Sequence, residues 1–259
     1  MAIFIYKGHS IHYREKSSDE DVLHHSFDRD IFFKGIPEYG SKEDDVIIDV
    51  GSHIGTFAIL AAIKAPRGEV YAIEACRESF SILERNVTEN HFDHVRTFHL
   101  ALADREGQTK LYYDTEQGNW GHSIVKHFSN EGETVETTSL DIFLAANRIE
   151  KVNLIKFNCE GAEFRILLNT SRESLERIEN YVILYHMDLE SEYHIDDLTR
   201  LFRGLGFYTN IRDVSRDRKR GWMIVVNRGV LYKYYFTCAS SIRWCVRLVR
   251  RIVQKIRPL

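Results

Sequence analysis

The sequence predicts an α/β protein built on a doubly wound, mostly parallel sheet of seven strands, with a small N-terminal β/α extension and a basic amphipathic C-terminal helix. Two patterns support this fold class. The β-branched run at residues 46–50 is followed by a turn with Gly51 and Gly55 and by an apolar, alanine-rich helix, as in a buried parallel strand with its crossover helix. From residue 46 to residue 227, further apolar runs of strand length alternate with helical segments, which favours helices on both faces of the sheet.

The individual elements follow from the same periodicities. The seven strands are expected at 46–50, 69–74, 95–102, 152–158, 181–187, 207–212 and 222–227, and the last two form an antiparallel edge. Helices are expected at 54–65, 77–90, 139–147 and 195–204, with one more ending near residue 169. An extra strand at 108–113 precedes a polar, irregular stretch at 114–136, and the extension holds strands at 3–6 and 11–13 and helices at 19–25 and 27–34.

Composition describes an ordinary globule of 259 residues, 44% apolar and 28% charged, with an uneven charge. The net charge is −3, but residues 231–259 hold seven Lys or Arg and no acid, so residues 1–230 carry −10. An acidic body makes nucleic acid an improbable partner. We expect three parts: an extension at 1–44 that covers one side of the ligand cleft, a sheet domain at 45–230 and a basic tail at 231–259.

The glycine turn predicts a nucleoside cofactor. It reads Asp49-x-Gly51-x-x-x-Gly55, and the next strand ends in Glu74, whose carboxylate could accept both hydroxyls of a ribose. An NAD-binding turn has glycine where Asp49 stands, and an acid there repels a pyrophosphate but suits the ammonium of a methionine moiety. The turn therefore favours S-adenosylmethionine over NAD. His53 either reaches the methionine carboxylate or faces solvent.

Four segments resemble the FkbM family of S-adenosylmethionine-dependent methyltransferases, across roughly residues 40–227. They are Ile48-Asp-Val-Gly-Ser-His-Ile-Gly55, Tyr71-Ala-Ile-Glu-Ala75, Ala101-Leu-Ala-Asp104 and Ile155-Lys-Phe-Asn-Cys-Glu-Gly-Ala-Glu163. The resemblance implies a Rossmann-like class I methyltransferase fold and methyl transfer, usually to oxygen on small natural products or glycans. The chain departs from the family pattern at His53, usually Asn, at Asn158, often Asp, and at Leu184, often Glu.

Further cofactor contacts are expected beside the ribose acid and after the third strand. Ala75 follows Glu74 directly. Backbone groups of Ala101, Leu102 and Ala103 could line the adenine, and Asp104 could accept from its amino group, although Asp is also common in such turns.

The catalytic candidates are Asn158 and Glu160, at the end of the fourth strand, and His186, at the end of the fifth. Transfer to an alcohol needs alignment and a base. Glu160 and His186 are candidates for this base. The alternatives are that Glu160 caps the following helix and that His186 is a hydrogen-bonded histidine at the edge of the core. As potential metal ligands, Glu160 and His186 alone are too few to predict a metal site. In the glycine-rich loop that follows the extra strand, Trp120, His122 and Ser123 either touch substrate or pack.

The predicted function is methyl transfer from S-adenosylmethionine to a hydroxyl of a small molecule, sugar or glycolipid. The alternatives are a cofactor-binding protein with weakened catalysis, an NAD-dependent dehydrogenase and, with support only from the tail, a nucleic-acid methyltransferase. Four cysteines without a Cys-x-x-Cys pair, and no basic-apolar leader, favour a cytoplasmic protein. Residues 240–257 predict an amphipathic helix that lies on an anionic membrane or packs on the body or on a second subunit.

Overall fold

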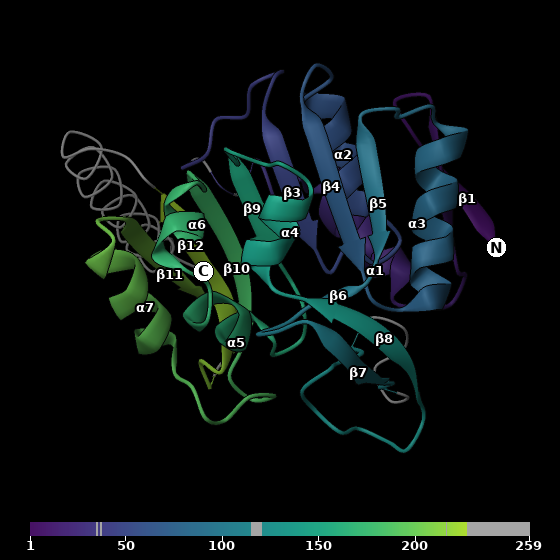
Figure 1. Ribbon diagram of the computed structural model, residues 1–259. Helices are drawn as coiled ribbons and strands as arrows, with labels where there is room; N and C mark the ends of the chain where they lie inside the picture. Colours follow the sequence, from purple (N-terminus) through teal and green to yellow (C-terminus); the bar gives the residue numbers. More distant parts are fainter. Residues whose placement is uncertain (35, 37, 115–120, 216, 227–259) are drawn as a thin grey trace, which may run out of the picture.

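The central feature of the molecule is a seven-stranded sheet with the order β11-β12-β10-β9-β3-β4-β5. The computed structural model describes residues 1–34, 36, 38–114, 121–215 and 217–226 (Figure 1). The sheet strands are β3 (Val46–Val50), β4 (Glu69–Glu74), β5 (Val95–His99), β9 (Leu154–Phe157), β10 (Asn180–His186), β11 (Tyr208–Asp213) and β12 (Arg220–Val226). All pairings are parallel except those of β12 with β10 and β11. The predicted doubly wound, mostly parallel sheet is confirmed.

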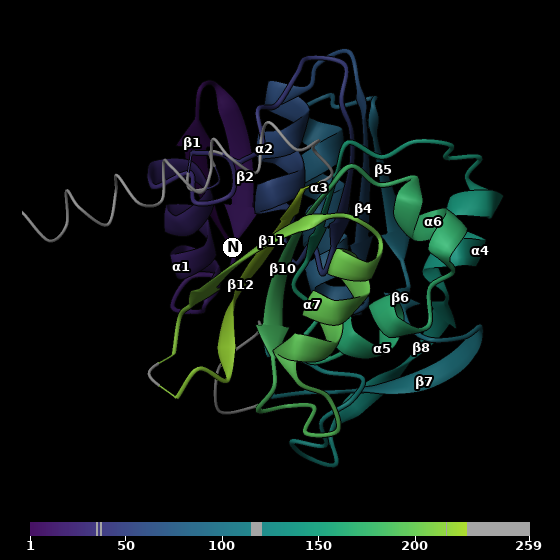
Figure 2. The ribbon, with the colours of Figure 1, turned by 90° about the vertical axis from the view of Figure 1, so that its left-hand side faces the viewer.

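Helices cover both faces of this sheet (Figure 2). One face packs against α4 (Leu140–Ala146), α5 (Glu163–Leu168), α6 (Arg172–Glu176) and α7 (Ile195–Gly204). The other packs against α2 (Thr56–Lys64), α3 (Arg77–Glu89) and the N-terminal extension. Because both faces are covered, the central strands are mostly apolar, which is why they could be predicted. The helix α6, opened by the Ser171 side chain at its N-terminus, was not predicted.

The chain reverses direction across the sheet at β3. After β3 it adds β4 and β5 on one side, and it then returns to add β9 on the other side. Doubly wound sheets bind ligands in the crevice at the carboxyl ends of the strands where this reversal occurs. In Figure 1 these ends point downward, toward a small second sheet.

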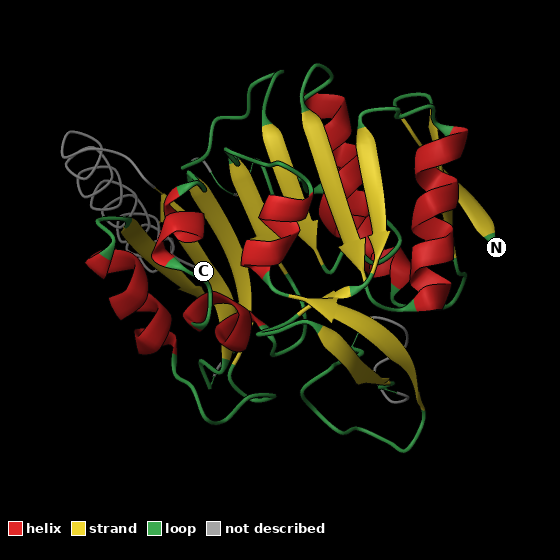
Figure 3. Ribbon diagram, in the orientation of Figure 1, coloured by secondary structure: helices red, strands yellow, loops and turns green. Residues whose placement is uncertain are grey.

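The second sheet has the order β6-β8-β7 and lies beneath the carboxyl edge of the main sheet (Figure 3). Its strands are β6 (Ala101–Leu102), β7 (Gly107–Tyr112) and β8 (Gly132–Thr138). Two expectations were wrong here. The strand expected at 95–102 is interrupted at Leu100 and supplies both β5 and β6. Residues 132–136, expected to be irregular, belong to β8, which pairs with β7 over the full length of β7.

The N-terminal extension packs on the face of the sheet that carries α2 and α3. It consists of the hairpin β1 (Ala2–Tyr6) and β2 (His9–Tyr13), α1 (Asp19–Leu23) and the π-helical turn η1 (His24–Asp28). The amide of Asn86 in α3 donates to the carbonyl of His12 at 3.1 Å and accepts from its N–H at 2.6 Å, which ties the hairpin to α3. The helix expected at 27–34 is not formed, since η1 ends at Asp28.

The basic tail at 231–259 lies outside the described residues. Among the residues that are described, no helix combines the length and the apolar character that crossing a membrane requires.

Candidate functional site

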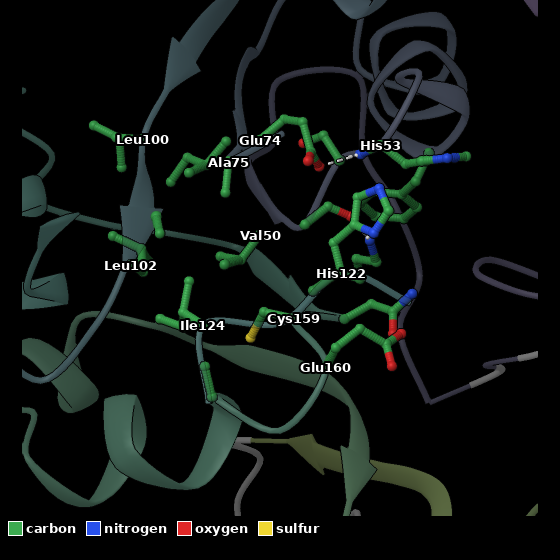
Figure 4. Close-up of a pocket in the computed structure, with 18 of the residues that line it drawn as sticks. Val50, His53, Glu74, Ala75, Leu100, Leu102, His122, Ile124, Cys159 and Glu160 are labelled. Carbon is green, nitrogen blue, oxygen red and sulfur yellow. Dashed lines mark hydrogen bonds between the residues drawn. The ribbon is translucent and has the colours of Figure 1, made fainter. Parts of the chain in front are cut away.

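A pocket opens at the carboxyl ends of β3, β4 and β9, where the chain reverses direction (Figure 4). The empty space within the pocket, including open solvent at its mouth, is about 880 Å³. One half is apolar and is lined by Leu100, Ala101, Leu102, Leu111 and Ile124. The other half carries the polar groups and is lined by Gly51, Ser52, His53, Glu74, His122, Lys156, Asn158 and Glu160.

Gly51 is required by the packing of two strands. Its φ is +74°, and a Cβ there would lie 1.9 Å from the carbonyl oxygen of Asn158. The sequence suggests that this glycine allows a ligand to approach. The structure adds a second reason, the close packing of Gly51 against the Asn158 backbone. Gly55 has φ +89° at the N-terminus of α2, where a Cβ would lie 2.6 Å from Leu83 Cδ1. Gly55 faces α3 and is not among the described residues that line the pocket.

The Glu74 carboxylate bridges the two turns that enclose the pocket. Its Oε2 accepts from the N–H of His53 at 2.7 Å, and its Oε1 accepts from the N–H of Cys76 at 2.8 Å. Burial raises the pKa of Glu74, and these two N–H groups offset part of that effect. Each oxygen keeps lone-pair capacity for a further donor, such as a ribose hydroxyl. Ala75 lines the pocket beside it.

His53 links the cofactor turn to the N-terminal extension. Its backbone is left-handed, with φ +54°, and its Nε2 lies 3.1 Å from Arg14 Nη2 and 3.2 Å from Asp19 Oδ1. Nδ1 is buried without a hydrogen-bond partner among the described residues. Burial lowers the pKa of His53 to about 4, so the ring is neutral at neutral pH. The solvent-facing alternative is wrong, because the side chain is only 14% exposed.

Asp49 is paired with a cation of its own chain. Its Oδ1 accepts from Lys156 Nζ at 2.8 Å, and the same ammonium donates to the Gly51 carbonyl at 2.8 Å. Both side chains are buried, and Lys156, not Asp49, is among the residues that line the pocket. Direct contact of Asp49 with a methionine ammonium therefore stays a prediction. Lys156 was not predicted as a site residue, although a charge inside an apolar strand signals a buried partner.

The residues expected around the adenine divide between two cavities. Ala101 and Leu102 line the apolar half of the pocket, whereas Ala103 and Asp104 line a neighbouring depression together with Thr109 and Arg165. Ile124 and Ala162 are common to both linings and separate the two spaces. The predicted contact of Asp104 with an adenine amino group stays a prediction, because Asp104 lines the neighbouring depression and not the pocket.

Glu160 is the carboxylate at the end of β9 that reaches the pocket (Figure 4). Behind it, His186 is buried and lies outside the described lining, with Nε2 3.5 Å from Glu160 Oε2 and Nδ1 3.1 Å from Glu163 Oε1. Glu163 also accepts from the N–H groups of Cys159 and Gly161, both at 2.9 Å, so Glu163 holds this turn. Glu160 was the alternative candidate for that capping role, and it is left facing the pocket.

Two further candidates, Asn158 and His122, line the pocket. Asn158 Oδ1 is buried with no hydrogen-bond partner among the described residues, so it can accept from a ligand. His122 lines the pocket, accepts from the N–H of Asp114 at 3.2 Å, and has its pKa lowered by burial. Ser123 is buried outside this lining, and Trp120 lies outside the described residues.

These features fit a cofactor with a flat apolar ring, a ribose and a polar end. The pocket has an apolar half, and its polar half includes the Glu74 carboxylate and the Asn158 amide oxygen, which can accept from a ligand. Together with the strand order, they define a Rossmann-like enzyme that binds a nucleoside cofactor. The chain belongs to the FkbM methyltransferase family, since the model of the Methyltransferase FkbM domain matches residues 49–208. Its methyl donor is therefore S-adenosylmethionine, and the dehydrogenase alternative is wrong.

Individual relatives are distant. The chain is 27% identical over 178 residues to the hexuronic acid methyltransferase AglP of Haloferax volcanii, covering 68% of this chain and 69% of that one. It is 23% identical over 224 residues to the 31-O-demethyl-FK506 methyltransferase FkbM of Streptomyces tacrolimicus, covering 75% and 80%. A solved methyltransferase FkbM from Methylobacillus flagellatus KT superposes with a TM-score of 0.48 at 14% identity, over 71% of this chain and 44% of that one.

Proposed function

We propose that this protein methylates a hydroxyl oxygen of a small molecule or of a sugar, free or lipid-linked. The observation that carries the proposal is the Glu160 carboxylate in the pocket wall, backed by His186 and Glu163. An alcohol is a weak nucleophile until its proton is removed, so a base at this position favours oxygen as the acceptor atom.

The environment of Glu160 suits a base. Burial raises the pKa of Glu160, which brings it closer to neutral pH, where a carboxylate accepts protons more effectively. Burial lowers the pKa of His186, but the carboxylates of Glu160 and Glu163 raise it further, and the net direction is upward. A protonated His186 would favour the charged form of Glu160 and hold its position.

S-adenosylmethionine supplies an electrophilic methyl group whose bonding electron pair stays on sulfur when it leaves. Glu74, Asn158 and the apolar half of the pocket would hold and orient this donor. As the new oxygen–carbon bond forms, the hydroxyl proton passes to Glu160. His186 then acts as a positioning residue, because its ring lies 3.5 Å from the Glu160 carboxylate and only Glu160 of the two is among the residues that line the pocket.

The acceptor class is supported by the names of the two relatives. The 31-O-demethyl name indicates a hydroxyl acceptor in that relative, whereas a hexuronic acid offers both hydroxyl and carboxylate oxygens, so the two names together support an oxygen acceptor. At 27% and 23% identity these names support a class and not a particular compound.

A second candidate is a protein that binds the donor without transferring its methyl group. Asn158 favours it, because a neutral amide at the active-site strand end cannot accept a proton. The same residue has an unpaired acceptor oxygen that would still bind ligand.

The test is incubation with a carbon-13 methyl donor and a panel of hexuronosides, hexosides, lipid-linked sugars and simple alcohols. The expected product is a methyl ether, located by its carbon and proton shifts. Methyl transfer to nitrogen or carbon would contradict the proposal. Tight binding of S-adenosylhomocysteine with no transfer to any member of the panel would favour the second candidate.

A further inference from the structure

Glu160 has an unfavourable backbone conformation. Its φ is +49°, in the left-handed region that side chains other than glycine avoid, and Gly161 follows with φ +101°. Such a conformation persists only where surrounding contacts fix it, and it is typical of functional turns. The contacts that fix Glu160 therefore determine where its carboxylate points.

Two sets of hydrogen bonds hold this turn, and they come from different parts of the fold. From α5, Glu163 accepts from the N–H groups on either side, those of Cys159 and Gly161. From the segment that bridges to β7, Ser123 Oγ donates to the carbonyl of Glu160 itself at 2.6 Å. Within the described residues, Ser123 is the hydroxyl that bonds directly to the Glu160 backbone.

Ser123 is itself held rigidly. It is 1% exposed, and its backbone pairs with Tyr112 of β7 through hydrogen bonds of 2.9 and 3.1 Å. Its Oγ also accepts from the N–H groups of Val125 and Lys126 at 3.0 and 3.1 Å. With two N–H donors on the oxygen, the hydroxyl proton is directed to the Glu160 carbonyl. Ser123 thus connects β7 to the turn that presents the carboxylate.

We infer that Ser123 is a positioning residue that aims Glu160 at the acceptor hydroxyl and makes the second sheet part of the catalytic apparatus. This inference rests on the proposed function, since it assigns Ser123 a role only if Glu160 takes the acceptor proton. The sequence left two roles open for Ser123, substrate contact and packing. The inferred role replaces substrate contact, because Ser123 acts through the Glu160 backbone and is not among the described residues that line the pocket. Misplacement of a reacting group by about 1 Å is enough to slow a reaction by about a hundredfold.

The experiment compares Ser123→Ala with Ser129→Ala in the full chain. Ser129 belongs to the same segment, and its hydroxyl donates to the Tyr113 carbonyl at 3.0 Å, away from Glu160. Ser123→Ala should lower kcat by about ten- to a hundredfold, with KM and the Kd for S-adenosylhomocysteine nearly unchanged. The acidic limb of its kcat profile should move to lower pH, because a released Glu160 is better solvated. Ser129→Ala should resemble wild type in each measurement.

A double-mutant cycle with Glu160→Gln makes the inference falsifiable apart from the proposed function. If Ser123 acts through the carboxylate, adding Ser123→Ala to Glu160→Gln should change kcat by less than about twofold. Multiplicative effects of the two substitutions, or a Ser123→Ala enzyme with wild-type kcat and pH profile, would overturn the inference and leave the proposed function standing. A Glu160→Gln enzyme with full turnover would overturn both.

Discussion

His53 makes stability depend on pH in a way that a single substitution can isolate. Burial holds the pKa of its ring at about 4, against 6.5 in an unfolded chain. Below pH 6.5 the unfolded chain binds a proton that the folded protein does not bind, so acid favours unfolding. The stabilisation is present above pH 6.5, declines as the pH falls, and is lost as the pH falls through about 4.

The size of the effect follows from the two pKa values. One unit of pKa difference corresponds to about 1.4 kcal/mol, so the loss should reach about 2 kcal/mol between about pH 7.5 and about pH 5, and about 3 kcal/mol near pH 4. Many other groups titrate in this range, so the useful quantity is the difference between wild type and His53→Asn. Asparagine tolerates the left-handed backbone of φ +54° and does not titrate.

Urea denaturation followed by circular dichroism at several pH values measures this difference. The unfolding free energy of wild type should fall relative to that of His53→Asn by about 2 kcal/mol between about pH 7.5 and about pH 5. The matched control is His91→Asn, because His91 has a similar backbone, with φ +56°, but an exposed side chain. Its curve should parallel that of wild type. Parallel curves for wild type and His53→Asn would refute the assignment of His53 as a buried neutral ring.

Three further outcomes are expected. Glu74→Ala should weaken binding of S-adenosylhomocysteine by about 1–3 kcal/mol in calorimetric titration, because charged hydrogen bonds to the ribose are lost, and unchanged affinity would remove Glu74 from the donor site. Lys156→Met should cost about 3–5 kcal/mol of unfolding free energy, since it leaves the buried Asp49 unpaired, whereas Lys151→Met, at an exposed ion pair with Glu179, should cost less than about 1 kcal/mol; equal costs would contradict the pairing. Removal of residues 231–259 should abolish co-sedimentation with anionic liposomes at low salt if the tail binds membrane, and equal recovery of both proteins in the supernatant would leave packing as its role.

The main sheet could be predicted because its information is local. β3 and β4 are short, mostly apolar segments, and the bounds of both were predicted to the residue. β8 could not be found in this way, because Val135 is its one apolar residue and the strand exists through its pairing with β7. The second sheet is therefore a product of tertiary contact.

In the candidate site, too, local features could be predicted and features that depend on tertiary contact could not. The cofactor turn and Glu74 lie within one β-α-β unit, where spacing alone implies proximity. Arg14, which pairs with Asp19, contacts His53 from a segment 39 residues away, and no periodicity in the sequence indicates this contact. The order in which Glu163, His186 and Glu160 approach the pocket depends on how β9 and β10 align, so the sequence offered Glu160 and His186 as equal candidates.

The central claim is that Glu160 takes the proton of an acceptor hydroxyl while the donor is held elsewhere in the pocket. Steady-state kinetics of Glu160→Gln with an acceptor that wild type methylates, combined with calorimetry of S-adenosylhomocysteine on the same preparation, tests it directly. We expect kcat to fall by about 10²–10⁴-fold while the donor Kd stays nearly the same. Wild-type turnover in Glu160→Gln would contradict the role of Glu160 as the base. It would mean that the site contributes to catalysis only by aligning its two substrates.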